Sequence, residues 1–231
     1  MAKKLPAVAS RLNGVVLESG AVDGMRFSST FAFQQALGWT AIHIEAAPDA
    51  FTLLEKNRPG SPSVKNINAA LCSQKRDLHF MMPPSPVIRG IWEFMSPTFR
   101  SKWYPRFEPL ANRPTLKPAS ELQKFKGSQT AAVEVIHCQT LNEVLPPDVN
   151  VVDVWFLDVE GAEADVLRAT DFSKLQVGII VKETAEDVLH ELQSSLLLRE
   201  AGFEHVGSDT GKRNSVFVNR CLGSNLQQLA E

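Results

Sequence analysis

Apolar segments and helix-forming segments alternate along most of the chain. The segments predicted as strands are residues 13–20, 40–45, 64–71, 151–159, 177–183, 203–206 and 215–218. Those predicted as helices are residues 28–37, 49–56, 162–169 and 186–201. Nearly continuous apolar strands separated by helices are typical of a parallel sheet covered on both faces, and the hairpin-type turn at 209–212 predicts a closing antiparallel pair. The pattern therefore predicts an α/β fold.

Residues 83–128 interrupt this alternation. The stretch is rich in proline, arginine and lysine, and it contains Trp92, Trp103 and Tyr104. A long segment without periodicity inside a compact domain is usually either functional or disordered, and the aromatic side chains argue against disorder. We expect one domain over residues 1–231 with an irregular insertion at about 83–130, which is either a lid that faces the substrate or a structural loop.

Charge and composition narrow the class of protein without defining its activity. The 231 residues include 24 basic and 26 acidic side chains, for a formal net charge of -2. Because this balance creates no overall field that would attract nucleic acid, we expect no nucleic-acid partner. No apolar run approaches the ~20 residues that span a bilayer, so we expect no membrane partner for this chain, and no secretory signal is predicted at its start. The oligomeric state is left open.

The cysteines Cys72, Cys138 and Cys221 lie far apart in the sequence. Their odd and sparse number argues against a disulfide framework and against a zinc site built on cysteine. We therefore expect reduced thiols, which favours a reducing compartment such as the cytoplasm.

Glycines and acidic residues follow the first predicted strand, at Glu18, Gly20, Asp23 and Gly24. Ligands bind beyond the carboxyl ends of strands in an open parallel sheet, and glycine lets the backbone approach a ligand closely. The loop lacks the G-x-G-x-x-G pattern, and its two carboxylates would lie beside a pyrophosphate bound at the helix start. The loop therefore favours a cationic ligand over a dinucleotide.

Three more groups of residues stand at strand ends. Glu45 closes the second strand, where an acid is expected to accept hydrogen bonds from the two hydroxyls of an adenosine ribose, unless it is a capping or exposed acid. Asn68 and Ala69 either lie against an adenine or serve packing alone. Asp158 and Glu160 follow the most apolar strand, and strand alternation places them on one side. Buried carboxylates are costly unless paired or used, so this pair is predicted to bind a cation, coordinate a metal, act as a general base or cap the next helix.

Taken in order, these segments resemble the FkbM-type family of S-adenosylmethionine-dependent methyltransferases. Residues 156–163 (FLDVEGAE) resemble the most recognisable motif of that family, and residues 14–24 (GVVLESGAVDG) resemble its nucleoside loop. Residues 38–48 resemble the strand with the ribose acid, residues 68–71 the adenine-side strand, and residues 138–141 (CQTL) the family's C-x-T-L segment. Two features depart from the family: the first loop lacks the three-glycine form of many methyltransferases, and the lead-in segment is short.

The resemblance implies a Rossmann-like class I methyltransferase sheet, seven-stranded and mostly parallel with a reversed final strand, and S-adenosylmethionine as the cofactor. It implies cofactor-binding roles for Glu18, Gly20, Asp23, Gly24, Glu45, Ala46, Asn68, Ala69 and Asp158, and catalytic roles for Asp158 and Glu160, with no metal. Glu18 and Asp23 would hold the amino-acid end and the sulfonium, and Glu45 would hold the ribose. Asp158 would face the transferred methyl group or the incoming nucleophile.

The leading hypothesis is an O-methyltransferase acting on a small-molecule or glycan hydroxyl. Methyl transfer requires that the protein align the partners and remove the proton of a hydroxyl acceptor. Three alternatives stay open. They are a catalytically degenerate methyltransferase fold that serves as a binding module, a metal-assisted enzyme using Asp158 and Glu160, and a nicotinamide-dependent oxidoreductase on a similar sheet.

Overall fold

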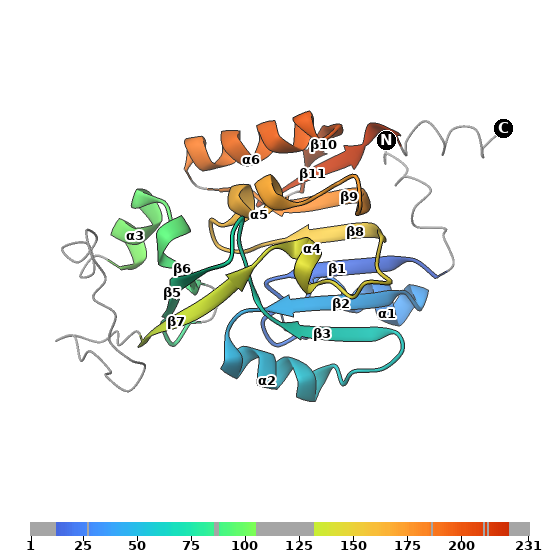
Figure 1. The fold of residues 1–231 in the computed structure, drawn as a ribbon, viewed down its shortest axis with the longest axis horizontal. Coiled ribbons are helices and arrows are strands. Elements are labelled where there is room, and N and C mark those ends of the chain that lie inside the picture. Colours follow the sequence, from blue (N-terminus) through green and yellow to red (C-terminus); the bar gives the residue numbers. More distant parts are fainter. Residues whose placement is uncertain are drawn as a thin grey trace.

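The chain folds into two β-sheets with helices packed around the larger one (Figure 1). The computed structural model describes residues 13–26, 28–85, 88–104, 132–185, 187–209, 211 and 213–221. The larger sheet has seven strands in the order β10-β11-β9-β8-β1-β2-β3, and the smaller sheet has four in the order β4-β7-β5-β6.

The larger sheet is the one that the apolar pattern predicts. Its strands are β1 (Val15–Ser19), β2 (Thr40–Glu45), β3 (Val64–Asn68), β8 (Val151–Leu157), β9 (Gln176–Glu183), β10 (Phe203–Ser208) and β11 (Asn214–Asn219). The five strands from β3 to β9 in the sheet pair in parallel, whereas β11 runs antiparallel to both β9 and β10. This arrangement confirms the predicted seven-stranded, mostly parallel sheet with a reversed final strand.

The helices of this region are α1 (Phe31–Leu37), α2 (Pro48–Asn57), α4 (Leu141–Val144), α5 (Glu163–Ala169) and α6 (Val188–Glu200). Helix α2 packs along β2 and β3, while α5 packs on α6 and α6 on β10. Figure 1 shows α2 and α6 at opposite ends of the sheet. No helix in the described part of the chain is long and apolar enough to cross a membrane.

The core lies between the central strands and their covering elements. Leu17 on β1, Ile42 on β2, Trp155 on β8 and Ile180 on β9 are fully buried. The Trp155 indole donates a hydrogen bond of 3.0 Å to the hydroxyl of Ser19 at the end of β1. Strands covered on both faces place apolar residues at nearly every position, which is why these strands stood out in the sequence.

The second sheet is a feature that the sequence pattern did not predict. Its elements are β4 (Ala70–Leu71), β5 (Arg76–Met82), β6 (Gly90–Ile91) and β7 (Ala132–Gln139), with the short helices η3 (Trp92–Phe94) and α3 (Pro97–Trp103) following β6. The predicted strand 64–71 is divided at Ala69, whose N–H donates to the carbonyl oxygen of Glu45 at 3.1 Å. Beyond Ala69 the chain leaves the larger sheet and β4 pairs with β7.

The predicted insertion at about 83–130 is partly ordered by this second sheet. Residues 88–104 form β6, η3 and α3, and the buried side chains of Met81, Trp92, Met95 and Tyr104 pack into one cluster. Residues 105–131 lie outside the described residues, so the remainder of that prediction, and the single-domain boundary of 1–231, stay predictions.

The cysteine prediction is wrong for two of the three residues. Cys72 and Cys138 form a disulfide with Cα atoms 5.7 Å apart, although 66 positions separate them in the sequence. The parallel pairing of β4 with β7 sets Ala70 opposite Cys138, so the fold brings together two residues whose spacing gives no sign of it. Cys221 is exposed and does not take part in this disulfide. Disulfides persist in oxidising environments, so the argument for a reducing compartment no longer holds.

Candidate active site

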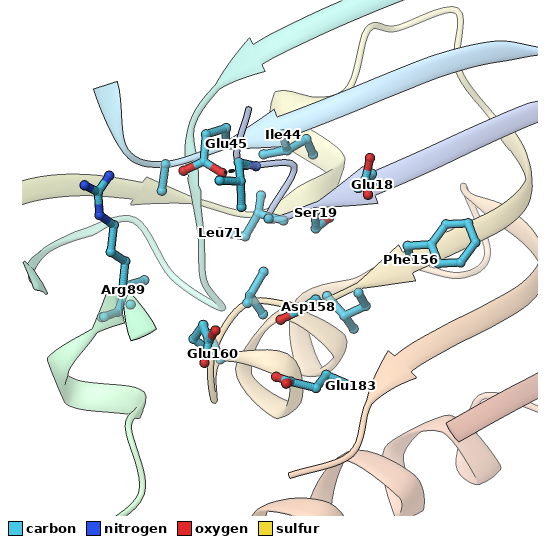
Figure 2. A pocket seen from close by; sticks show the side chains of 18 of the residues that line it. Glu18, Ser19, Ile44, Glu45, Leu71, Arg89, Phe156, Asp158, Glu160 and Glu183 are labelled. Carbon is cyan, nitrogen blue, oxygen red and sulfur yellow. Dashed lines mark hydrogen bonds between the residues drawn. The ribbon is translucent and has the colours of Figure 1, made fainter. Parts of the chain in front are cut away.

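A pocket of about 770 Å³ opens where β1, β2, β8 and β9 end. Its size lies within the range typical of small-molecule sites. The acidic side chains in its lining are Glu18, Glu45, Asp158, Glu160 and Glu183. Figure 2 shows Glu45 on one side of the pocket and the group of Asp158, Glu160 and Glu183 on the other. The pocket thus has two acidic ends, and we call them the Glu45 end and the Asp158 end.

The loop after β1 joins the two ends through Gly20. This glycine has a φ of 87°, and a Cβ atom at this position would overlap the backbone carbonyl oxygen of Asp158. The N–H groups of Gly20 and Ala21 both donate to the carbonyl oxygen of Ile44, at 2.9 and 3.2 Å. Only glycine combines this backbone conformation with so close an approach to another backbone segment, and its role in binding a cofactor stays a prediction.

Glu18 is buried at the end of β1 and holds the segment before α1. Its carboxylate accepts hydrogen bonds from the Ser28 hydroxyl (2.8 Å), the Ser29 N–H (2.5 Å) and the Thr30 hydroxyl (2.8 Å). Because these residues bind Glu18, α1 begins at Phe31 and not at residue 28 as the sequence predicted. Burial raises the pKa of Glu18, and the three hydrogen bonds counteract part of that rise. Its assignment to the amino-acid end of a cofactor stays a prediction.

Asp23 and Gly24 are not among the residues that line the pocket, and their predicted roles in binding the cofactor stay predictions. The Asp23 carboxylate accepts hydrogen bonds from the N–H groups of Met25 (3.0 Å) and Arg26 (2.9 Å), so it caps its own turn. A Cβ atom on Gly24 would overlap the side chain of Leu54 on α2. Both residues shape the loop, and neither is among the residues that line the cavity.

Glu45 ends β2 with both carboxylate oxygens engaged by backbone donors. One oxygen accepts from the N–H of Val22 at 2.8 Å, and the other accepts from the N–H of Ala47 at 2.7 Å. Burial raises the pKa of Glu45 to about 7, although the two N–H donors and the charge of Arg89 lower it. A carboxylate has about four lone-pair sites, so ionised Glu45 can still accept two hydroxyl hydrogen bonds.

Three more residues predicted to bind the cofactor lie near this carboxylate. Ala46 and Ala69 line the pocket with small side chains. Asn68 does not line it, because its side-chain amide turns back to donate a hydrogen bond of 2.8 Å to the carbonyl oxygen of Glu45. Asn68 therefore fixes the end of β2 from outside the cavity.

The Asp158 end is formed by a turn and a neighbouring strand. Asp158 follows β8, and its N–H donates to the carbonyl oxygen of Ser19 at 3.1 Å. Carboxylate oxygens of Asp158, Glu160 and Glu183 all lie within 4.8 Å of one another. Asp158 and Glu160 thus meet as predicted, but through the left-handed backbone of Glu160 (φ 52°) in the turn after the strand, and not through strand alternation.

Asp158 and Glu183 form a tightly coupled carboxyl pair. They share a hydrogen bond, and desolvation raises the pKa of both groups. The charges of Glu163 and Glu18 raise the pKa of Asp158 further, while the hydrogen bond from Glu183 lowers it. The charges of Asp158 and Glu163 and the shared hydrogen bond raise the pKa of Glu183. Two adjacent carboxylates that share a hydrogen bond cannot both ionise easily, so the pair retains a proton to a higher pH than an isolated acid. Glu183 closes β9 and was not singled out in the sequence, although the strand-end rule that selected Glu45 would also have selected it.

The same three carboxylates could hold a hard cation, because oxygen atoms are the ligands that Mg²⁺ and Ca²⁺ prefer. The carboxylate of the nearby Glu163 instead accepts hydrogen bonds from the N–H groups of Val159 (3.0 Å) and Gly161 (3.3 Å) and so stabilises the turn. The expectation that the site uses no metal stays a prediction.

The second sheet supplies a wall of the pocket, and part of this wall lies within the insertion predicted at about 83–130, although no residue of it was singled out in the sequence. Phe80 on β5 and the segment Arg89, Gly90 and Ile91 line the cavity together with the main-sheet residues. The pocket is therefore built from both sheets, with the acidic ends of the parallel strands on one side and a partly apolar cover on the other.

A seven-stranded sheet in this order, with a pocket at the carboxyl ends of its parallel strands, defines a class I methyltransferase fold. A family model described as the methyltransferase FkbM domain matches residues 18–204, which is most of the chain. The protein therefore belongs to the FkbM methyltransferase family, as the resemblance implied. A comparison with curated protein sequences finds no match.

Solved structures that are similar to this chain have low sequence identity to it. A methyltransferase FkbM from Methylobacillus flagellatus KT is 9% identical, with a TM-score of 0.45, over 89% of this chain and 43% of that one. A precorrin-6y C5,15-methyltransferase from Geobacter metallireducens GS-15 is 14% identical, with a TM-score of 0.42, over 92% and 83%. Fibrillarin from Aeropyrum pernix, in complex with natively bound S-adenosyl-L-methionine, is 12% identical, with a TM-score of 0.41, over 93% and 68%.

Proposed function

We propose that the protein is an S-adenosylmethionine-dependent O-methyltransferase that acts on a hydroxyl group of a small molecule or glycan. Membership of the FkbM family supports methyl transfer. The observation that carries the proposal for a hydroxyl acceptor is the coupled carboxyl pair of Asp158 and Glu183, which lies in the same pocket as Glu45.

The residues of the pocket fit the proposed cofactor. Glu45 would accept hydrogen bonds from the ribose hydroxyls, and the small side chains of Ala46 and Ala69 leave room for the adenine. The acidic lining suits a positively charged sulfonium, because opposite charges within a few ångströms in a partly buried site attract strongly. Besides Glu45, the acids of the predicted set that line this cavity are Glu18, Asp158 and Glu160.

When bound, S-adenosylmethionine supplies a methyl group on a cationic sulfur. In the proposed reaction an O–CH₃ bond forms on the acceptor as the S–CH₃ bond breaks, and the hydroxyl proton must leave. The Asp158 and Glu183 pair would take that proton. A base works best when its pKa lies near the working pH, and the raised pKa of Asp158 brings it closer to neutrality than an ordinary aspartate. Glu160 lies within reach of the same position.

Two measurements test this proposal in order. Calorimetric titration with S-adenosylhomocysteine should show binding, and no binding at millimolar ligand would show that the cofactor assignment is wrong. Transfer of a labelled methyl group to a panel of sugars, phenols and hydroxylated lipids should then yield an alkali-stable ether. Binding without transfer to any member of the panel, or to its amine counterparts, would favour a binding module. Loss of transfer on adding a chelator would favour the metal-assisted alternative.

A further inference from the structure

An ion pair connects the second sheet to α2 at the Glu45 end of the pocket. The Arg89 Nη1 atom lies 2.8 Å from the Oδ1 atom of Asp49, and the Arg89 side chain is only 15% exposed. The Arg89 Nε atom also donates to the carbonyl oxygen of Pro83 at 3.1 Å. Both hydrogen-bonding edges of this guanidinium are therefore fixed, so its charge has a defined position in the pocket wall.

The ion pair stands next to the carboxylate assigned to the ribose. Asp49 is in the first turn of α2, four residues after Glu45, and its Oδ1 atom also accepts from the N–H of Ala50 at 2.9 Å. Arg89 approaches from the other sheet and lines the pocket. Figure 2 shows its side chain extending toward the side of the pocket that holds Glu45.

The segment that carries Arg89 is anchored on both sides. The hydroxyl of Tyr104 donates a hydrogen bond to the carbonyl oxygen of Ile88, directly before Arg89. Directly after it, Gly90 packs so closely on the turn of the Asp158 end that an added Cβ atom would lie 3.0 Å from the Cβ of Glu160. Arg89 is thus held between the two ends of the pocket by neighbouring residues that cannot shift freely.

The charged groups around Glu45 act on it in opposite directions. Burial is the largest influence and raises its pKa, the charge of Arg89 lowers it, and the charge of Asp49 raises it. Glu18 from β1 lines the same pocket, and from β3 only the neutral Asn68 is in contact. Two residues earlier on β2, buried His43 is neutral at physiological pH, because burial lowers its pKa to about 4.

We propose that Arg89 is a positioning residue for the nucleoside end of the cofactor. Its charge acts on Glu45, while its ion pair with Asp49 fixes the second sheet against α2. The inference rests on the proposed role of Glu45 in binding the ribose. It assigns to the second sheet a part in cofactor binding, through a residue that need not touch the cofactor itself.

Replacing each partner of the ion pair in turn distinguishes an electrostatic effect on Glu45 from a purely structural role. Affinity for S-adenosylhomocysteine would be measured by calorimetry from pH 5.5 to 8.5, because ribose hydroxyls need the ionised form of Glu45 as their acceptor. Without the positive charge, Arg89→Gln should move the midpoint of the pH profile upward and weaken binding at pH 7 by about three- to tenfold. Asp49→Asn removes a negative charge, so its midpoint should move downward. Arg89→Lys should restore the wild-type midpoint.

A purely structural role predicts a different result. Both variants break the same ion pair, so both would weaken binding equally and leave the midpoint unchanged, and that outcome would overturn the inference. Arg76→Gln is the matched control, since Arg76 is also on the second sheet and lies 3.6 Å from Asp165 but does not line the pocket. Failure of the wild-type protein to bind at any pH would instead overturn the proposed function, and thermal melts confirm that each variant is folded.

Discussion

The two acidic ends of the pocket contain the same kind of group in different surroundings. At the Glu45 end, one buried carboxylate accepts two backbone N–H groups whose positions are fixed by the fold. At the Asp158 end, Asp158 and Glu183 bond to each other, with Glu160 beside them. Burial raises the pKa at both ends, but the partners differ: donors at one end, another acid at the other.

This difference separates binding from proton transfer. Fixed N–H donors favour the charged form of a carboxylate and leave it ready to accept further hydrogen bonds from hydroxyl groups. A second carboxylate favours a shared proton, which makes the pair able to release or accept one near neutral pH. Under the proposed function, one type of residue would therefore serve two functions in one cavity because the fold supplies different neighbours.

Replacing Asp158 by asparagine should have the largest effect, and this effect should be on turnover at the Asp158 end of the pocket. The variant removes the proton acceptor while keeping nearly the same shape, so kcat should fall by about 10²- to 10⁴-fold, the usual contribution of a positioned acid or base. Affinity for S-adenosylhomocysteine should change by less than about threefold, because binding of this ligand transfers no proton to Asp158. Single-turnover rates and calorimetry on the same preparation measure the two effects.

The control for this variant is Asp148→Asn, an exposed aspartate that pairs with Lys65 at 2.9 Å and lies outside the pocket. It should leave both kcat and affinity unchanged. If Asp158→Asn lost affinity and turnover to the same extent, Asp158 would be a cofactor-binding group and not the proton acceptor, and the distinction between the two ends would be lost.

The second largest effect is expected for a substitution in the loop that joins the two ends of the pocket, and it is an effect on stability. Gly20→Ala forces a side chain into the space occupied by the carbonyl oxygen of Asp158, in addition to the strain of its positive φ. Gly38 is the matched control, because it also has a positive φ of 67° but has open space around it. Gly38→Ala should cost about 1–2 kcal/mol of the free energy of unfolding, and Gly20→Ala distinctly more. Equal losses in urea titrations would mean that the contact with Asp158 is unimportant.

Glu45→Gln is expected to have a smaller and more selective effect. Glutamine keeps one acceptor oxygen but offers an NH₂ group to a second N–H donor, and it lacks the charge that strengthens hydrogen bonds to hydroxyls. Affinity for S-adenosylhomocysteine should fall by about 10- to 100-fold, the cost of one or two charge-assisted hydrogen bonds. At saturating cofactor, kcat should stay within a fewfold of wild type. Unchanged affinity by calorimetry would remove Glu45 from the ribose assignment.

The sequence was sufficient for the larger sheet and for part of the site. Its buried strands are almost continuously apolar, and this pattern can be recognised in the sequence alone. Glu45 was found because an acid at a strand end is a local feature. Asp23 and Gly24 were assigned with the same reasoning but turn away from the pocket, since the side chain of Asp23 satisfies its own turn. Which way a loop residue faces is decided by such local hydrogen bonds, and the spacing does not encode it.

The second sheet and its disulfide could not be predicted from the apolar pattern of the sequence. Strand β5 is exposed at its first two positions and only partly alternating afterwards, so its apolar pattern is weak. Its partner β7 begins fifty residues after β5 ends (Met82 pairs with Ala132), and such pairing depends on three-dimensional proximity. The ion pair of Arg89 and the Cys72–Cys138 disulfide both depend on the position of these strands, so neither could be predicted from the sequence.

The smallest expected effect concerns pH and stability, and it tests the Glu45 end alone. Because the pKa of Glu45 is raised from 4.5 to about 7 in the folded protein, its stabilising contribution is fully present below pH 4.5 and is lost as the pH rises through 7. Buried His43 acts in the opposite direction, since its pKa is lowered to about 4 and stability falls as the pH drops from 6.5. The wild-type melting temperature alone would therefore mix two trends.

The difference in melting temperature between wild type and Glu45→Gln isolates the glutamate, because His43 is common to both. Between pH 5.5 and pH 8 the melting temperature of the wild type should fall relative to that of Glu45→Gln. In a protein of this size, each kcal/mol corresponds to about 2–4 °C. Saturating S-adenosylhomocysteine should reverse the trend, since its ribose hydroxyls stabilise the ionised carboxylate. A difference that is constant with pH, with and without ligand, would mean that Glu45 ionises like an exposed acid, and the contrast with the Asp158 end would then rest on geometry alone.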